Sequence, residues 1–204
     1  MNDQVILVNA GTGNLRSVYK ALASLGANVS LTSDPQSILD GDRVILPGVG
    51  AFGDFMAGLR TLGLEEAILE IARSGKPLLG ICVGMQALFD TGEEMGKHKG
   101  LGLMAGKVGR FPDTPGLKIP HTGWNQLWLQ TRSRLWQNLE AGAYAYFNHS
   151  YYCMPDDPED VIANTDYGIQ FASAVQHNNL FGVQFHPEKS QTVGLQILAN
   201  FLQE

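Results

Sequence analysis

A cysteine flanked by glycines is the residue whose type and setting most clearly predict chemistry. Cys82 lies in the sequence Gly80-Ile-Cys-Val-Gly84, after the apolar run Leu78 to Ile81 and before a helical pattern that begins at Met85. This arrangement is the cysteine form of a nucleophile elbow, a strained strand-to-helix turn that projects its central side chain above the carboxyl edge of a sheet. We therefore predict that Cys82 is a nucleophile with a helix amino terminus beneath it.

A nucleophilic cysteine needs a base and a group that orients the base. The tripeptide His186-Pro-Glu188 follows an apolar run at 180–185. The residue before proline favours extended geometry, and positions i and i+2 of an extended segment face the same way, so His186 and Glu188 are predicted to share a face. Alone, the tripeptide is typical of a surface turn. Together with a thiol elbow it indicates a triad of Cys82, His186 and Glu188.

The thiol also needs an environment that favours its ionised form. An unperturbed thiol has a pKa of about 8.5, so an imidazolium at His186 and the helix amino terminus would both favour the thiolate. Attack on a carbonyl creates an oxyanion, which needs preorganised N–H donors. The backbone N–H of Val83 is one candidate, and the loop Gly48-Val49-Gly50 is the predicted source of a second. The alternative for this loop is a simple tight turn between a strand and a helix.

The elements that must position these groups alternate along the first half of the chain. Apolar runs of strand length occur at 5–8, 29–31, 44–46 and 78–81, and helical spacing is found at 18–25, from 34 onward, at 55–62 and at 64–72. This alternation predicts parallel strands with right-handed crossovers, in which ligands collect at the carboxyl ends of the strands. Both Cys82 and the loop at 47–53 are expected at that edge.

The second half has a different pattern. We predict a solvated loop at 92–102, antiparallel strands at 108–111, 127–129, 144–147 and 169–175, a further strand at 180–185, and a final amphipathic helix at 193–202. The expected fold is one α/β domain over residues 1–204. It has three layers, with a mainly parallel sheet flanked by helices and additional antiparallel strands in the C-terminal half.

The composition is that of an ordinary globular protein. Of the 204 residues 44% are hydrophobic and 17% are charged, and the net charge is −6 without any Lys/Arg block. We therefore expect neither a nucleic-acid nor a membrane-surface partner. The run Val5 to Val8 is too short for a signal or spanning segment, and no basic region precedes it, so we expect a cytoplasmic protein.

Two further features have plainer interpretations. Cys153 lies in an apolar stretch and is interpreted as a buried small hydrophobe; both thiols are expected to be free, and no Cys/His cluster predicts a metal. Gly11-Thr-Gly13 follows the first strand, but Arg16 replaces the third glycine of a G-x-G-x-x-G motif. A tight turn with Asn14 capping the next helix is therefore favoured over a phosphate site.

Three motifs, taken in order, resemble those of a known family. Pro47-Gly-Val-Gly-Ala-Phe52, Gly80-Ile-Cys-Val-Gly-Met-Gln86 and His186-Pro-Glu-Lys-Ser190 are similar to the motifs of the class I (triad) glutamine amidotransferases, whose fold is flavodoxin-like. The likeness runs from the first strand to the last helix. It is closest to the glutaminase subunits of imidazole glycerol phosphate synthase, since the anthranilate branch usually has His-Gln in place of Met85-Gln86.

The resemblance implies that Cys82 attacks the side-chain amide of L-glutamine, forms a glutamyl thioester and releases ammonia. His186 would transfer the protons and Glu188 would orient His186, with no cofactor and no metal. The oxyanion loop would require a peptide rearrangement, biased by a partner. The oxyanion donors implied are Val49 and Val83, and the substrate-binding residues implied are Gly48, Gly50, Gln86, Ser150 and Tyr151.

The resemblance also implies a heterodimer with a separate (β/α)8-barrel cyclase subunit. Ammonia would pass directly into the cyclase, because ammonia lost to water is largely protonated and is no longer a nucleophile. The cyclase would make imidazole glycerol phosphate and aminoimidazole carboxamide ribotide in histidine biosynthesis. Asn14, Trp124 and Lys189 match positions that meet the cyclase in relatives; the alternatives are a core aromatic for Trp124 and a solvated charge for Lys189.

Other interpretations stay open at this point. The same chemistry could serve anthranilate or pyridoxal phosphate synthesis, although Met85 and His149-Ser-Tyr151 weigh against this. A stand-alone thiol peptidase or γ-glutamyl hydrolase would hydrolyse its substrate without a partner. A non-enzymatic regulator on the same fold is disfavoured by the intact Cys, His and Glu set.

Overall fold

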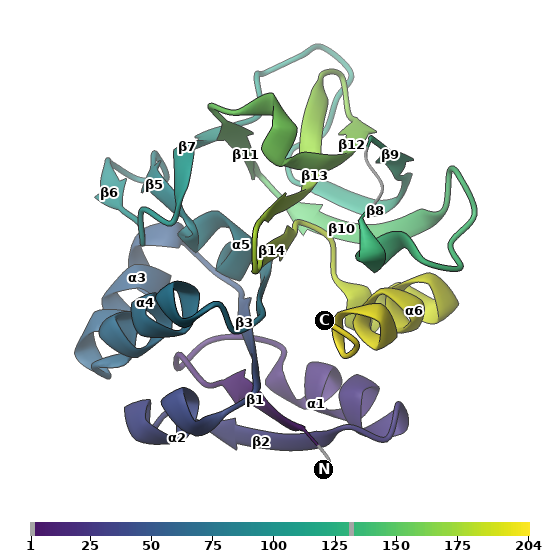
Figure 1. Cartoon of the computed structure of the whole chain (residues 1–204). Coiled ribbons are helices and arrows are strands. Elements are labelled where there is room, and N and C mark those ends of the chain that lie inside the picture. The colour runs from purple at the N-terminus through teal and green to yellow at the C-terminus, as the bar shows by residue number, and fades with distance from the viewer. Residues whose placement is uncertain (1–2, 131–132) are drawn as a thin grey trace.

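A long mixed sheet organises the chain (Figure 1). The computed structural model describes residues 3–130 and 133–204. Within these residues, ten strands follow one another in the order β2-β1-β3-β4-β14-β13-β11-β7-β5-β6, and β12 pairs with both β13 and β9. A separate two-stranded sheet is formed by β10 and β8.

The first half of the chain forms the parallel part of the sheet. Its strands are β1 Gln4–Val8, β2 Asn28–Thr32, β3 Arg43–Gly48 and β4 Leu78–Cys82, all paired in parallel. Figure 1 shows α2, α3 and α4 on one side of these strands and α1 and α6 on the other, which gives three layers. The helices are α1 Leu15–Ser24, α2 Pro35–Asp40, α3 Phe52–Thr61, α4 Leu64–Ser74, α5 Val83–Ala87 and α6 Gln191–Phe201.

The second half adds strands that are mostly antiparallel. β14 runs parallel to β4 and joins the two halves, and β13 pairs with β14 in the antiparallel sense. The strands of this half are β5 Phe89–Gly92, β6 His98–Lys99, β7 Met104–Arg110, β8 His121–Gln126, β9 Trp128–Leu129, β10 Tyr144–His149, β11 Tyr151–Pro155, β12 Val161–Asp166, β13 Gln170–His177 and β14 Leu180–Val183. Short 3₁₀ helices are η1 Arg134–Trp136, η2 Pro158–Asp160 and η3 Pro187–Lys189.

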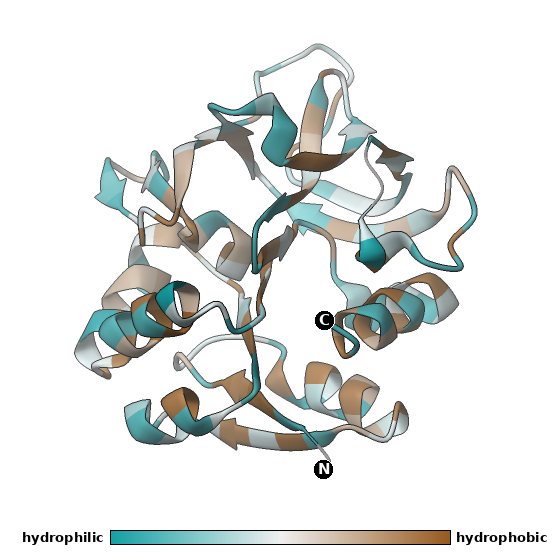
Figure 2. Cartoon of the chain, viewed as in Figure 1, coloured by the Kyte–Doolittle hydropathy of each residue, from teal (hydrophilic) through white to brown (hydrophobic). Residues whose placement is uncertain are grey.

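The core lies on both faces of the parallel strands. Every residue of β4 is buried, and so are Val5 to Val8 of β1, as expected for strands covered by helices on both sides. Helix α4 alternates brown and teal along its ribbon in Figure 2, and its buried residues Leu64, Ala67, Ile68 and Ile71 recur at helical spacing. Burial of these apolar faces holds the strands in place, and with them the loops at their carboxyl ends.

The predicted fold class is confirmed, and several local predictions are wrong. The segment 92–102, predicted to be a solvated loop, contains the end of β5 and all of β6. The helix predicted to begin at Met85 begins at Val83, ends at Ala87 and is followed by β5 from Phe89. Strands β8, β11 and β12 are not predicted from the sequence, although β11 lies in the apolar stretch around Cys153 and β12 begins with three apolar residues.

Candidate active site

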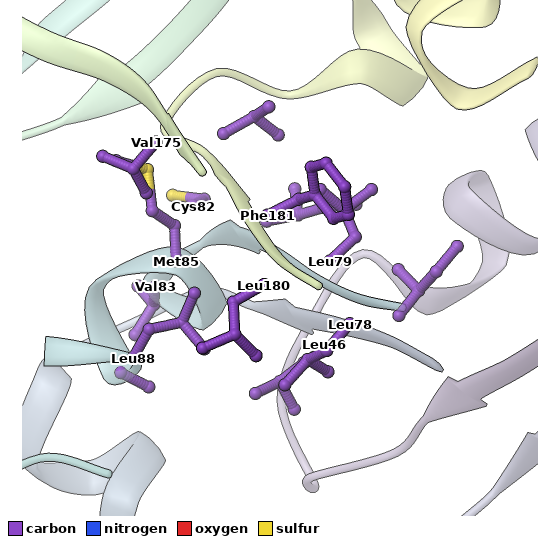
Figure 3. Close-up of a cluster of buried hydrophobic side chains, with 14 of the residues drawn as sticks. Leu46, Leu78, Leu79, Cys82, Val83, Met85, Leu88, Val175, Leu180 and Phe181 are labelled. Atoms are coloured by element: carbon purple, nitrogen blue, oxygen red, sulfur yellow. The ribbon is translucent and has the colours of Figure 1, made fainter. Parts of the chain in front are cut away.

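The turn at Cys82 has the strained geometry of a nucleophile elbow. Cys82 has φ 55° and ψ −111°, a conformation that L-residues rarely adopt. A Cβ at Gly80 would lie 2.5 Å from the carbonyl oxygen of Gly84, and a Cβ at Gly84 would overlap the carbonyl oxygen of Leu46. The flanking glycines are therefore required by close backbone approach. Figure 3 shows Cys82 in a packed cluster with Leu79, Met85 and Val175.

Three strand ends converge at the sulfur. In the parallel pairing of β3 and β4, Gly48 lies opposite Cys82. In the pairing of β14 and β4, Val183 lies opposite Ile81, so the residues that follow β14 pass beside Cys82. The topology thus brings the Gly48 loop, the thiol and the His186 segment to one edge of the sheet, as the sequence predicts.

His186 and Glu188 meet at that edge. Nδ1 of His186 lies 3.1 Å from Oε1 of Glu188, and both side chains are almost fully buried. Ser190 fixes the segment, because its hydroxyl accepts from the Tyr146 N–H at 2.9 Å and donates to the His186 carbonyl at 2.7 Å. The two side chains meet, but not because both residues are extended, as the sequence predicts. His186 is extended, but Glu188 lies in the 3₁₀ helix η3, which turns its carboxylate back toward the imidazole.

The expected role of Asn14 as a helix cap is wrong. Asn14 precedes α1 but makes no side-chain capping bond. Instead its Nδ2 donates to Oε1 of Glu188 at 3.2 Å, so this oxygen has two polar neighbours. Asn14 therefore belongs to the surroundings of the triad carboxylate.

The ionisation of the pair follows from these contacts. Burial alone would disfavour the imidazolium, but hydrogen bonds and charge interactions with Cys82 and Glu188 outweigh burial and raise the pKa of His186 to about 9. Burial opposes ionisation of Glu188 as well, yet His186 and Asn14 hold the pKa of this carboxyl below its ordinary value. The site can thus hold a charged imidazole at neutral pH, ready to donate a proton.

A cavity of about 280 Å³ opens over the thiol. It has room for a small molecule of amino-acid size. Its wall includes several residues predicted from the sequence and several that were not. The predicted lining residues are Val49, Gly50, Cys82, Val83, Gln86, Ser150, Tyr151, His186 and Lys189, and the others are Glu94, Pro120, Asn148 and His149.

Gly48 is the predicted substrate contact that does not line this cavity. It is buried at the end of β3, where a Cβ would lie 2.8 Å from the backbone nitrogen of Gly84 and 2.7 Å from the Phe55 ring. Gly48 therefore permits the close packing of the loop against the elbow. The next residue, Val49, is 36% exposed and lines the cavity together with Gly50.

The side chain of Gln86 is held by two acceptors. Its Nε2 donates to the Tyr151 carbonyl at 3.1 Å and to Oε1 of Gln184 at 3.1 Å. Both N–H groups are used, so Oε1 of Gln86 is the group available to a ligand. Gln86 thus links α5 to β11, which carries the predicted backbone contact at Tyr151.

Glu94 and Gln184 are two of the polar residues of this site that sequence reasoning missed, besides Asn148 and His149 in the cavity wall. Glu94 lines the cavity, and its Oε2 accepts from the Phe52 N–H at 2.8 Å, at the start of α3. Gln184 is fully buried and donates from Nε2 to Sγ of Cys82 at 3.7 Å. An amide inside the apolar run 180–185 was a usable signal for Gln184, whereas Glu94 lies in the segment that was predicted to be a solvated loop.

Two of the predicted interface residues lie close together, near the mouth of the cavity. Lys189 lines the cavity and its Nζ is 5.6 Å from the centre of the Tyr146 ring. Trp124 packs against the same ring with centroids 6.2 Å apart and is 47% exposed, so it is not a core aromatic. Asn14 is placed elsewhere, on Glu188.

The remaining predictions concern Cys153, a metal site and a membrane-spanning segment. Cys153 is 1% exposed, and both cysteines are free, so Cys153 is a buried small hydrophobe as predicted. Within residues 3–130 and 133–204 no three His, Cys, Asp or Glu side chains are grouped as metal ligands would be. In the same part of the chain, no helix is both long and apolar enough to cross a membrane.

Comparison with known proteins finds close relatives over almost the whole chain. Residues 6–204 match the family described as "Glutamine amidotransferase class-I". The imidazole glycerol phosphate synthase subunit HisH of Moorella thermoacetica is 50% identical over 97% of this chain and 93% of that protein. The subunit of the same name from Dehalococcoides mccartyi is 51% identical over 97% of this chain and 95% of that protein.

Solved structures with the same fold are more distant in sequence. A structure described as "Crystal structure of glutamine amidotransferase" superposes with a TM-score of 0.76 at 20% identity, covering 97% of both chains. "Structure of PurLQS from Thermotoga maritima" gives a TM-score of 0.74 at 21% identity, covering 100% of this chain and 97% of that one. At this level of identity the likeness concerns the fold alone.

Proposed function

Since this chain belongs to the class-I glutamine amidotransferases, and within them to the family of imidazole glycerol phosphate synthase HisH subunits, we propose that it hydrolyses glutamine and supplies ammonia to a cyclase subunit. The pathway is histidine biosynthesis, as the name of these relatives implies. The observation that carries the chemistry is the meeting of Cys82 and His186 at one cavity, with Glu188 bound to Nδ1 of His186 behind it. Residues 1–204 act as one amidotransferase domain, and the free thiols fit a cytoplasmic enzyme.

The reaction begins at the sulfur. The Cys82 thiolate attacks the side-chain amide carbon of glutamine and forms a C–S bond, and the carbonyl electrons move to oxygen. The imidazolium of His186 then gives its proton to the amide nitrogen, the C–N bond breaks, and ammonia leaves a glutamyl thioester. The raised pKa of His186, about 9, suits this step because the proton is present at neutral pH.

Water completes the cycle. After ammonia has left, neutral His186 takes a proton from water, whose oxygen forms a bond to the thioester carbon. The C–S bond breaks, its electron pair returns to sulfur, and glutamate departs. Glu188 keeps Nδ1 of His186 protonated and the ring oriented, through the contact at 3.1 Å.

The oxyanion formed in both steps would be held by backbone N–H groups. Val83 follows the nucleophile, and Val49 lies in the loop that lines the cavity beside it. Because Val49 is partly exposed and Gly50 has φ 95°, a rotation of the peptide between Gly48 and Val49 is the switch we propose for assembly of this site. The partner subunit would bias the switch.

The cavity offers complementary groups for the α-amino and α-carboxylate ends of glutamine. Oε1 of Gln86 and the carboxylate of Glu94 would accept hydrogen bonds from the α-ammonium group. The backbone of Ser150 and Tyr151 would donate to the α-carboxylate. This assignment adds Glu94 to the substrate-binding residues predicted from the sequence.

The partner is a cyclase subunit, for which we propose a (β/α)8 barrel that forms a heterodimer with this chain and makes imidazole glycerol phosphate and aminoimidazole carboxamide ribotide. The support is the exposed cluster of Trp124, Tyr146 and Lys189 beside the cavity mouth. An exposed tryptophan beside a second aromatic ring is typical of the centre of an interface. Asn14, the third residue proposed to meet the cyclase, lies apart from this cluster and contacts Glu188.

The test measures glutamate release with and without the cyclase and its ribotide ligand. We expect low release alone and strong release in the complex, whereas a stand-alone γ-glutamyl hydrolase would be fully active alone. Cys82→Ala should abolish glutamine-dependent synthesis and leave ammonia-dependent synthesis intact. Residual use of glutamine by this variant would refute the nucleophile assignment, and stimulation only by an anthranilate- or pyridoxal-phosphate-forming partner would change the acceptor.

A further inference from the structure

We propose that Gln184 is a further catalytic residue, whose amide donates a hydrogen bond to the Cys82 sulfur and at the same time holds Gln86 in place. The proposal rests on the proposed glutaminase function for its meaning. It concerns a residue that neither the triad nor the substrate contacts include. The observations that support it are burial, register and the direction of three hydrogen bonds.

Gln184 is placed beside the nucleophile by the sheet itself. It follows Val183, which pairs with Ile81 in parallel β14 and β4, so Gln184 stands next to Cys82. Its backbone N–H still donates to the Ser173 carbonyl at 2.9 Å, which keeps the strand direction beyond the last residue of β14. The position is therefore as rigid as the strands around it.

The amide is completely buried in an apolar run. Gln184 has an exposed fraction of 0%, between Val183 and Phe185, which are equally buried. A buried amide is unfavourable unless its polar atoms find partners. Both polar atoms of the Gln184 side chain have a partner. Oε1 accepts from Gln86 at 3.1 Å, and Nε2 lies 3.7 Å from Sγ of Cys82.

The direction of these bonds is fixed by a main-chain carbonyl. The carbonyl of Tyr151 can only accept, so the Gln86 atom 3.1 Å from it is the Nε2 donor. The same Nε2 faces Gln184, whose nearer atom must be the acceptor Oε1. The NH₂ end of Gln184 is thereby left pointing at the sulfur.

This orientation matters for both halves of the reaction. An N–H aimed at sulfur stabilises the thiolate more than the neutral thiol, because hydrogen bonds to charged groups are the stronger ones. In the resting site the bond favours the attacking thiolate. When the thioester is hydrolysed, the C–S bond breaks and its electron pair returns to sulfur, so the same N–H stabilises the leaving thiolate.

The experiment compares two variants that remove the same bond between the amides. Gln184→Met and Gln86→Met both abolish the contact of Gln86 with Gln184, but only Gln184→Met removes the donor from the sulfur. Alkylation of the full-length protein by iodoacetamide, without glutamine or partner, reports the thiolate. The variant Cys82→Ala gives the background from Cys153, which is buried.

For Gln184→Met we expect alkylation about tenfold slower than in the parent at pH 7, because a hydrogen bond to the thiolate is lost, and a smaller difference at pH 10. For Gln86→Met we expect alkylation within about twofold of the parent at both pH values, with a KM for glutamine that rises as it does for Gln184→Met. Equal slowing by both variants, or slowing by neither, would overturn the proposal and leave Gln184 as a structural amide.

A second variant and a control separate loss of the sulfur contact from loss of the fold. Gln184→Glu keeps the acceptor for Gln86 but has no donor for the sulfur when ionised, so at pH 8 alkylation should be slow while KM stays near the parent value. Alkylation as fast as in the parent would count against the sulfur contact. Ser173→Ala removes a fully buried hydroxyl from the adjoining strand and should leave alkylation unchanged.

The two proposals can fail separately. If the alkylation pattern holds but no partner stimulates glutamate release, the role of Gln184 at the thiol stands and the proposed function falls. If glutamine hydrolysis is coupled as expected but alkylation is unaffected by Gln184→Met, only the inference about Gln184 falls.

Discussion

Three buried histidines in and beside the cavity occupy two kinds of environment. His186 is 4% exposed, His121 is 3% and His149 is 6%, so burial is nearly the same. The triad contacts raise the pKa of His186 to about 9, while burial lowers the pKa of His121 to about 4 and that of His149 to about 3. Equally buried histidines therefore differ in charge at neutral pH: His186 is positive, and His121 and His149 are neutral.

The difference lies in the partners. His186 faces a carboxylate and a thiol, which both gain from a positive imidazole. His149 instead donates from Nδ1 to the Tyr151 carbonyl at 2.7 Å, and its Nε2 lies 3.1 Å from Nδ1 of His121. The His121 ring stacks on Phe147 with centroids 4.8 Å apart. A carbonyl, a second imidazole and aromatic rings offer no charge to compensate a proton.

The two environments also suggest two functions. Charged His186 can give and take protons at the reacting atoms. The neutral pair can only hold positions, and it holds a carbonyl that also accepts from Gln86. The hydrogen bonds of this group all run in one direction. Nδ2 of Asn125 lies 3.2 Å from Nε2 of His121 and donates to it, and Nδ1 of His121 donates to Nε2 of His149. The predictions below test this contrast between a proton carrier and a positioning pair.

The largest effect is expected from removal of the charged imidazole. His186→Asn leaves an amide near Glu188 but no proton carrier, so glutamine hydrolysis in the cyclase complex should fall by about 10³-fold or more. Steady-state glutamate release measures this loss. His177→Asn is a matched control, since His177 also pairs with a carboxylate, Asp160 at 2.8 Å, but lies outside the cavity. It should keep activity within about twofold.

A smaller loss is expected when only the charge opposite His186 is removed. Glu188→Gln preserves the shape of the side chain, but its amide cannot stabilise the imidazolium and can present an N–H to Nδ1. The turnover number should fall by about 10²- to 10³-fold, and His186 should lose its proton at lower pH than in the parent. The pH profile of kcat in the complex measures both. A profile superimposable on that of the parent would show that Glu188 does not set the charge of His186.

How far the sequence predicts this molecule depends on the kind of element. The parallel half follows from apolar runs and helical spacing, since strands such as β1 and β4 are buried on both faces. Strand β8, His121–Gln126, contains half-buried and exposed residues and pairs with β10 outside the main sheet, so its pattern carries no such signal. Its residue His121 was consequently not considered for the site.

The same division applies to the functional residues. Positions of Cys82 and His186 follow from local motifs and from the rule that parallel strands present ligands at their carboxyl ends. The roles of Gln184 and Glu94 depend on strand register and on the structure of segment 92–102, for which the sequence predicts a solvated loop. The capping prediction for Asn14 failed: its Nδ2 donates to a carboxylate 174 residues away, and its side chain makes no bond to the start of α1. Long-range contacts of this kind cannot be derived from spacing alone.

The third prediction concerns the positioning pair. His149→Phe keeps an aromatic ring among Phe111, Phe147 and Phe171 but removes the donor to the Tyr151 carbonyl. We expect the KM for glutamine in the complex to rise by about 10-fold and kcat to change by less than about threefold, because one hydrogen bond that orients the binding site is lost. A fall in kcat at unchanged KM would mean that His149 acts in proton transfer instead.

The smallest effect should appear in stability as a function of pH. A histidine whose pKa is lowered to about 4 in the folded state, as for His121, contributes stability above its unfolded pKa near 6.5 and loses it as pH falls toward 4, since the unfolded chain binds the extra proton. The slope is about 1.4 kcal/mol per pH unit for one such group.

His121→Phe should be less stable at pH 7, because Asn125 and His149 lose a partner, yet its free energy of unfolding should fall less steeply with acid. Urea unfolding at pH 7, 6 and 5 measures the difference, expected to be about 1 kcal/mol between pH 6 and 5. Parallel curves for parent and variant would mean that His121 is not neutral in the fold, and the contrast with His186 would then rest on His149 alone.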